Sequence, residues 1–383
     1  MIKSNIVLDG NYLLMKNVFI LKKLRALSDL QMLLERDYDK ITRSFPFDNI
    51  YFVSDSRESN WRKQVYKEYK GKRKKDIDID WDFVFETYDN FKEIIKTKRN
   101  NKLLEFPGLE GDDFIAHIIT TSNKKGYSNI LVASDGDLQQ LLDYDINNNY
   151  INVQWNYRFS DERLYLPENY QLFLDSINNS ESTDIFSLDN SSDFSNYIEN
   201  LINRTKIKSI IKEQLLFEKI VQGDNSDNIP SIIKIKDGKL NPEGRGIGES
   251  GAKSVYKLYK EIHPEAIDIH SDIFLSRLME VILYYKKIKN AEQDMKDQII
   301  KNIIFNRMLI TLDSKYLPVH INENLNNHFD IIDNQKIEII NENLEKKLEE
   351  EDFFTEEKTD IAENFRVEEP SNADFNPDDF WEL

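Results

Sequence analysis

The sequence predicts an α/β fold, in which a largely parallel sheet flanked by helices is followed by a second, helical part. Three observations carry this prediction. Short apolar runs alternate with stretches of helical periodicity through the first 150 residues. Acidic residues follow or precede several of these runs, and a glycine-rich turn opens a helical pattern in the second half. Strands that alternate with helices pair in parallel, so we expect one sheet-based domain and one helical domain.

The elements follow from these patterns in chain order. Strands are expected at 6–8, 50–53 and 130–133. Helices are expected at 13–34, 112–120, 207–222, 252–261, 273–289 and 292–305, with another starting at 138. Residues 176–197 are rich in Asn, Ser and Asp, which predicts an inserted mobile loop. From 342 onward, charge and low complexity predict a disordered tail.

The net charge of −18 is unevenly distributed. Residues 342–383 contain sixteen acidic and four basic residues, so the tail alone carries −12. The rest of the chain carries −6, which the acidic clusters described below would account for. The body of the protein is therefore not repulsive to nucleic acid in the way that the total suggests.

Residue usage excludes several classes of protein. The chain has no cysteine, which rules out disulfide frameworks and thiolate zinc sites, and its five histidines show no ligand spacing. Asp9 and Gly10 interrupt the first apolar stretch, so no signal peptide is expected. No apolar run approaches the roughly 20 residues of a membrane span. We expect a cytoplasmic protein without a membrane partner.

The candidate functional residues fall in five short acidic segments, called phrases here, at residues 6–10, 51–55, 110–113, 134–137 and 223–228. Because carboxyl ends of parallel strands share one edge of a sheet, we expect these side chains to gather there. A lone aspartate after a strand is more commonly a helix cap or turn residue, but five such phrases together favour divalent cations, which prefer oxygen ligands. Two cations about 3.5–4 Å apart are the usual means of hydrolysing phosphodiesters. The acidic residues are Asp9, Asp55, Glu110, Asp112, Asp113, Asp135, Asp137, Asp224 and Asp227.

In this order, the phrases resemble the 5′-nuclease superfamily of flap endonucleases and of the DNA polymerase I 5′-nuclease domain, most of all its bacteriophage RNase H branch. The likeness covers roughly residues 5–320. The matching motifs are Leu8-Asp9-Gly10-Asn11-Tyr12-Leu13-Leu14, Glu110-Gly111-Asp112-Asp113, Ser134-Asp135-Gly136-Asp137 and Gly223-Asp224-Asn225-Ser226-Asp227-Asn228-Ile229-Pro230.

The resemblance implies a division of the chain. A PIN-like catalytic domain is expected over 1–150, with a basic arch over about 57–80. An expanded polar insertion would follow over 151–205. A helical duplex-binding domain of the helix-three-turn-helix type, with a helix-hairpin element, is expected over 206–325. The acidic tail over 342–383 completes the expected organisation.

The resemblance also implies two metal sets, filled by Mg²⁺ with Mn²⁺ as a substitute. The first ion would activate water, and both would stabilise charge on the phosphate and leaving oxygen. Asp113 is either an outer ligand or a helix residue. The first set is Asp9, Asp55, Glu110, Asp112 and Asp135, and the second is Asp137, Asp224 and Asp227.

Residues 61–75, called the basic segment below, hold eight basic residues, one acid and interleaved aromatics. Such a run is commonly a solvated face, but basic side chains also neutralise phosphates and aromatics stack on unpaired bases. Tyr69-Lys70-Gly71-Lys72-Arg73 resembles the family's arch motif. The resemblance implies that Lys70 contacts the scissile phosphate, that Tyr69 stacks on a base, and that Arg62 and Arg73 clamp phosphates. DNA contacts are also expected from Lys63, Lys67, Lys72 and Lys74.

A glycine cluster precedes a predicted helix in the second half. It is either an ordinary turn or a set of backbone N–H groups that hold an anion. It resembles the family's helix-hairpin element, which grips the duplex backbone and encloses a potassium ion. Compared with family spacing, residues 232–244 are additional. The residues concerned are Gly246, Gly248, Gly251, Lys253 and Lys257.

The tail ends in acidic residues with Phe375, Phe380 and Trp381 among them. An acidic, aromatic peptide suits a partner's hydrophobic groove, so a sliding clamp or single-strand-binding protein is the expected partner. A purely solubilising tail is the alternative.

We therefore expect a monomeric, metal-dependent, structure-specific 5′ nuclease of phage origin. It would act on duplex DNA with a 5′ flap or on an RNA–DNA hybrid during replication and primer removal. One alternative is a PIN-type endoribonuclease, which would leave the second half unexplained. Another is a catalytically silent, structure-specific DNA-binding factor.

Overall fold

The computed structural model describes residues 2–56, 60–73, 77–98, 101–148, 150–158, 161–180, 194–236 and 239–332, without the side chains of 177–180 and 326–332. Lys74, the tail and residues 181–193 lie outside the described residues. The described chain divides into two compact units. The first contains 2–60, 77–212 and 312–332, and the second contains 61–73 and 213–311. The basic segment is therefore part of the second unit, together with most of the C-terminal helices.

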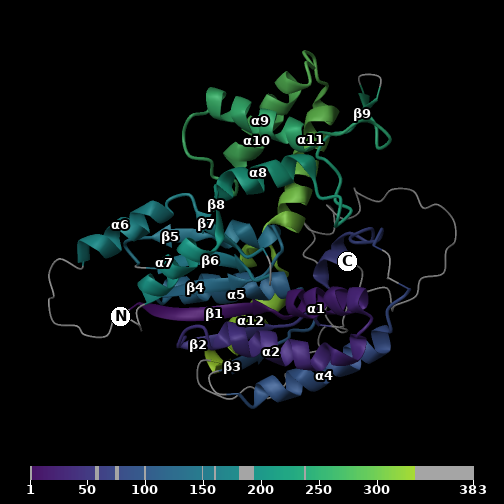
Figure 1. The fold of residues 1–383 in the computed structure, drawn as a ribbon. Coiled ribbons are helices and arrows are strands. Elements are labelled where there is room, and N and C mark those ends of the chain that lie inside the picture. Colours follow the sequence, from purple (N-terminus) through teal and green to yellow (C-terminus); the bar gives the residue numbers. More distant parts are fainter. Residues whose placement is uncertain are drawn as a thin grey trace. The chain divides into compact units, whose positions relative to one another are not determined.

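The first unit is built on a sheet. Its strands are β1 (Lys3–Asp9), β2 (Asn49–Val53), β3 (Asn101–Leu104), β4 (Tyr127–Val132), β5 (Asp143–Asp145), β6 (Tyr150–Asn156), β7 (Arg163–Pro167) and β8 (Lys206–Ile210). Their order is β3-β2-β1-β4-β6-β7-β8, with β5 paired to β6. The run from β3 to β6 is parallel, whereas β7 is antiparallel to β6 (Figure 1). The predicted largely parallel sheet is confirmed.

Helices cover both faces of this sheet, because alternate residues of a strand point to opposite sides. Ile6 and Leu8 of β1 join the core formed with the helices between β1 and β3. Asn5 points the other way, and its amide donates to Ser122 in the helix that precedes β4. The helical elements of the unit are α1 (Gly10–Leu24), η1 (Leu27–Asp29), α2 (Leu30–Thr42), α4 (Trp81–Lys96), α5 (Gly111–Lys124), η2 (Asp137–Leu141), α6 (Tyr170–Ser180), α7 (Phe194–Arg204), η4 (Ser314–Tyr316) and α12 (Val319–Ile332).

The second unit is mainly helical. It packs around aromatic side chains, with the ring of Phe217 edge-on to those of Tyr259 and Phe274. The elements of the second unit are α3 (Trp61–Val65), α8 (Lys212–Gln222), β9 (Ile235–Lys236), β10 (Lys239–Leu240), α9 (Glu249–Ile262), α10 (Asp272–Tyr285) and α11 (Gln293–Ile310).

Across the ranges that the structure describes, no helix combines the length and the apolar character that a membrane span requires.

The structure corrects two expectations about residues 151–222. The expected polar insertion over 151–205 supplies β6, β7 and α7, and Phe194, Ile198 and Leu201 of α7 are buried in the core. The expected helix over 207–222 begins only at Lys212, because residues 206–210 form the edge strand β8 beside β7. This strand is largely exposed and lysine-rich, which is typical of a protected sheet edge.

Candidate active site

The strand order brings three of the predicted carboxylates to one edge of the sheet. The chain runs from β1 outward through β2 and β3, and then returns to place β4 on the other side of β1. Asp9 ends β1 beside Val53, two residues before Asp55. Val132, three residues before Asp135, pairs with Leu8 in β1. Such a switch in strand order is where open α/β sheets bind ligands.

Asp9 is both the last residue of β1 and the cap of α1. Its carboxylate accepts the backbone N–H of Tyr12 at 3.0 Å. Burial raises its pKa to about 7, and the charges of Asp55 and Asp135 add to this rise against the hydrogen bonds from Tyr12 and Asn11. The raised pKa means that Asp9 ionises fully at neutral pH only if a positive charge is supplied.

Asp55 and Glu110 are held at the beginning of α5. Asp55 Oδ1 accepts the N–H of Gly111 at 2.5 Å, and a Cβ on Gly111 would lie 2.8 Å from the same oxygen. Glycine is therefore required for this approach. Glu110 is buried, and its Oε1 accepts the side-chain amide of Asn60 at 3.1 Å.

Asp112 and Asp113 occupy the first turn of α5, where carboxylates interact favourably with the helix dipole. Asp113 is buried, and its N–H donates to the carbonyl of Glu110. Its position favours the helix-residue interpretation over an outer ligand.

Asp135 and Asp137 lie in the turn between β4 and η2. The exposed Asp135 accepts the N–H of Asp137 at 2.8 Å, while the amide of Gln154 donates to the Asp135 carbonyl at 2.7 Å. The carboxylate is thus fixed by its own turn and by β6, with its surface open to solvent.

The first unit's carboxylates fit a divalent cation by charge and by donor type. Across the ranges that the structure describes, no three acidic or histidine side chains converge into a ready-made metal cage. Asp55 and Asp135 nevertheless lie near enough to Asp9 for their charges to raise its pKa. Three mutually repelling oxygen donors at the end of parallel strands are suited to a hard cation.

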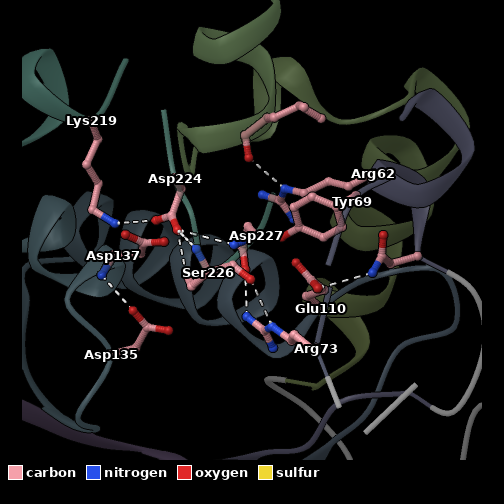
Figure 2. Close-up of polar contacts among 12 residues, drawn as sticks. Arg62, Tyr69, Arg73, Glu110, Asp135, Asp137, Lys219, Asp224, Ser226 and Asp227 are labelled. Atoms are coloured by element: carbon pink, nitrogen blue, oxygen red, sulfur yellow. Dashed lines mark hydrogen bonds and ion pairs between the residues drawn. The ribbon is translucent and has the colours of Figure 1, made fainter. Parts of the chain in front are cut away.

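The remaining predicted ligands, Asp224 and Asp227, belong to the second unit. Asp224 pairs with Lys219 at 3.0 Å and accepts both the N–H and the hydroxyl of Ser226 (Figure 2). Burial opposes ionisation of Asp224, but Lys219 and Ser226 outweigh it and lower the pKa to about 2. Asp224 is thus ionised throughout the neutral range.

Asp227 is hydrogen-bonded to the basic segment. Its Oδ2 accepts the hydroxyl of Tyr69 at 2.9 Å, and its Oδ1 accepts Nη2 of Arg73 at 2.6 Å (Figure 2). Its backbone carbonyl accepts the N–H of Lys70 at 3.0 Å. The predicted metal ligand and the predicted phosphate-binding residues are therefore in direct contact.

These contacts correct two predicted roles. Tyr69 is only 2% exposed, so its ring does not present a face on which a base could stack. Arg62 is equally buried, and its Nε donates to the carbonyl of Leu309 at 2.8 Å, so it is a structural residue and not a phosphate clamp. Lys67 and Lys72 are exposed, whereas Lys63, Lys70 and Arg73 are half-buried.

The structure gives the residues of the glycine cluster different roles. A Cβ on Gly246 would lie 2.8 Å from that of Ser231, and Gly251 is similarly crowded by Ile247, so both have packing roles. Gly248 has open space around it and caps α9, on which Lys253 and Lys257 are exposed. The N–H of Ile247 already donates to the Ser231 hydroxyl, which removes it from any anion site.

Sequence reasoning missed three residues that hold the carboxylates: Asn60, Gly111 and Lys219. Gly111 lies inside the motif Glu110-Gly111-Asp112-Asp113, and its identity as glycine is the signal that the sequence offers. Nothing in the sequence singles out Asn60, whose partner is fifty residues away.

Residues 4–167 match the family model described as the 5′-3′ exonuclease N-terminal resolvase-like domain. A 5′-3′ exonuclease of Mycoplasmopsis pulmonis is 24% identical over 359 residues, covering 91% of this chain and 96% of the relative. The ribonuclease H of Enterobacteria phage T4 is 25% identical over 95 residues, covering 24% of this chain and 31% of that enzyme.

Among solved structures, a bacteriophage T5 flap endonuclease in a complex with DNA and metal ions aligns with a TM-score of 0.51 at 16% identity. The alignment covers 87% of this chain and 100% of that one. At this identity the likeness shows the fold. Together with the family match over residues 4–167 and the ordered carboxylates, it supports the 5′-nuclease superfamily, whose matched members are 5′-3′ exonucleases and flap endonucleases, enzymes that hydrolyse phosphodiester bonds.

Proposed function

We propose that this protein is a metal-dependent, structure-specific 5′ nuclease that cleaves 5′ flaps and degrades 5′ ends of duplex DNA or RNA–DNA hybrids. The observation that best supports this proposal is the edge where β1, β2 and β4 end, at which Asp55 and Asp135 are close enough to Asp9 for their charges to raise its pKa. A DNA substrate is supported by the DNA-bound T5 flap endonuclease, whose fold the chain shares.

Different residues of the chain would bind the metal ions, orient the ligands and contact the phosphate. Asp9, Asp55, Glu110, Asp112 and Asp135 of the first unit would hold the first Mg²⁺, and Asp137 would be a ligand of a second. When bound, such ions supply Lewis-acid stabilisation of the attacked phosphate and of the attacking water. Gly111 and Asn60 orient Asp55 and Glu110, and the half-buried Lys70 would meet the scissile phosphate.

Three further assignments complete the proposal. Gly248, Lys253 and Lys257 at the start of α9 would grip the duplex backbone, with potassium as the associated ion. The acidic tail would dock on a sliding clamp or single-strand-binding protein. Primer removal during replication, in a phage, is the proposed setting.

The test uses a 5′-labelled flap duplex and a blunt RNA–DNA hybrid, each with Mg²⁺ and with chelator. Wild-type protein should cleave near the flap junction only with Mg²⁺, and Asp135→Asn should lose turnover while keeping DNA affinity. Asp175→Asn, an exposed aspartate on α6, is the matched control and should retain activity. Tight binding without cleavage would instead indicate a DNA-binding factor, and cleavage confined to unstructured RNA would indicate an endoribonuclease.

A further inference from the structure

The contacts of Asp227 point to a role other than direct metal ligation. Asp227 is 9% exposed, and each carboxylate oxygen already accepts a hydrogen bond, from Tyr69 or from Arg73. Hydrogen bonds of this kind, with an ionised acceptor, are roughly twice as strong as neutral ones. In the same loop, Asp224 instead accepts hydrogen bonds from Lys219, from Ser226 and from the N–H of Asp227.

The backbone around these side chains is unusual on both sides. Lys70 and Asn228 both have φ of +58°, a left-handed conformation that residues other than glycine rarely adopt. The two are tied across the contact, because the Lys70 N–H donates to the Asp227 carbonyl and the Asn228 amide donates to the carbonyl of Glu68. Such a conformation persists where surrounding contacts impose it.

The other end of the basic segment is fixed to the same unit. Arg62 bonds to the carbonyl of Leu309 in α11, and the ring of Tyr66 packs edge-on against Phe305 at 5.2 Å. The Tyr66 hydroxyl donates to the carbonyl of Asn228 at 3.1 Å. Between these fixed points, the half-buried Lys70 has its Nζ 5.2 Å from the Tyr69 ring centre.

We propose that Asp227 is a positioning residue for Lys70, acting through Tyr69 and Arg73, and is not a direct metal ligand. Its carboxylate and carbonyl hold the left-handed turn from which the Lys70 side chain projects. This inference rests on the proposed function, because it assumes that Lys70 meets the scissile phosphate. It also replaces base stacking as the role of Tyr69 and makes Arg73 a positioning residue in place of a phosphate clamp.

The test is a double-mutant cycle in single-turnover cleavage of the flap duplex. Tyr69→Phe removes one hydrogen bond to a charged group and should lower the rate about tenfold. Asp227→Asn should lower it at least as far, and the double variant should be no slower than Asp227→Asn alone. Tyr256→Phe removes a comparable hydroxyl, bonded to Glu213 in the same unit, and should leave the rate unchanged.

Metal dependence separates positioning from ligation. The Mg²⁺ concentration for half-maximal rate should stay within about twofold of wild type in Asp227→Asn and in Tyr69→Phe, since neither removes a ligand. A rise of tenfold or more in Asp227→Asn alone, or additive losses in the cycle, would overturn the proposal. Arg73→Lys, which keeps the charge, should recover part of the rate that Arg73→Ala loses.

The contact between Asp227 and the basic segment can also be measured without catalysis. This measurement distinguishes failure of the positioning role from failure of the proposed function. Tryptic cleavage after Lys70 and Lys72 should be faster in Asp227→Asn and Tyr69→Phe than in wild type and Tyr256→Phe. Equal cleavage rates in all four proteins would refute the positioning role even if no nuclease activity were found.

Discussion

Oδ1 of Asp55 lies 2.5 Å from the backbone nitrogen of Gly111, so that a residue just past β2 is tied to the first residue of α5. This contact fixes a carboxylate that would otherwise sit on a loop. It also explains why the motif Glu110-Gly111-Asp112-Asp113 contains a glycine, since a methyl group there would lie 2.8 Å from the carboxylate oxygen.

Gly111→Ala should therefore displace Asp55 without unfolding the protein. We expect a loss of turnover of tenfold or more and a higher Mg²⁺ requirement, because a shift of a few tenths of an ångström misplaces an oxygen ligand. The measurement is cleavage rate against Mg²⁺ concentration. Gly136→Ala is the matched control, because a Cβ at that position meets nothing within 4 Å. Equal Mg²⁺ dependence in the two variants would refute the role of Gly111.

Apolar runs predicted the sheet edge well. The runs before Asp9, Asp55 and Asp135 became β1, β2 and β4, and β1 pairs with each of the other two. Apolar runs are sufficient to predict these strands. The roles of Tyr69 and Arg62 could not be predicted in the same way. Their partners, Asp227 and Leu309, lie 158 and 247 residues further along the chain, and only tertiary packing reveals that both side chains are buried. The strand β8 was not predicted, because its sequence is short and lysine-rich and most of its residues are exposed, so that it contains no buried apolar run.

Asp9→Asn should separate stability from activity. Burial and the charges of Asp55 and Asp135 raise the Asp9 pKa from 3.8 to about 7, so the ionised side chain costs folding free energy as pH rises through that interval. Stability from this group is greatest below pH 3.8 and is lost by pH 7, an effect on the order of 4 kcal/mol at most. The neutral variant should therefore melt at a higher temperature than wild type at pH 8 in chelator, while losing turnover.

Added Mg²⁺ provides the complementary measurement for Asp9. Ligand that binds only the folded state raises its stability, so wild type should gain thermal stability with Mg²⁺ and Asp9→Asn should gain less. A lower melting temperature for Asp9→Asn in chelator would contradict the predicted repulsion at this edge.

His117, buried in α5, should contribute to acid sensitivity. Burial lowers its pKa to about 4, with the charge of Lys124 adding to the effect. An unfolded chain takes up this proton near pH 6.5, so folding stability falls as pH drops from 6.5 to about 4 and is then unaffected by this group. His117→Gln should reduce that loss by on the order of 3 kcal/mol. Unfolding midpoints of both proteins from pH 7.5 to 4 test this, and parallel curves would contradict it.

The ion pair between Glu249 and Lys253 allows a two-sided test of the proposed duplex grip. The two side chains lie one turn apart at the exposed start of α9, with 2.6 Å between Oε1 and Nζ. If Lys253 binds a backbone phosphate, Glu249 competes with that phosphate for the same ammonium group. Glu249→Gln should then tighten duplex binding severalfold, whereas Lys253→Gln should weaken it on every sequence.

The slope of log affinity against log salt should fall by about 0.9 in Lys253→Gln, as for one lost phosphate contact. Lys206→Gln removes an exposed charge of the first unit and should leave both quantities unchanged. Equal effects of Lys206→Gln and Lys253→Gln would show that net charge, and not this face of α9, governs binding.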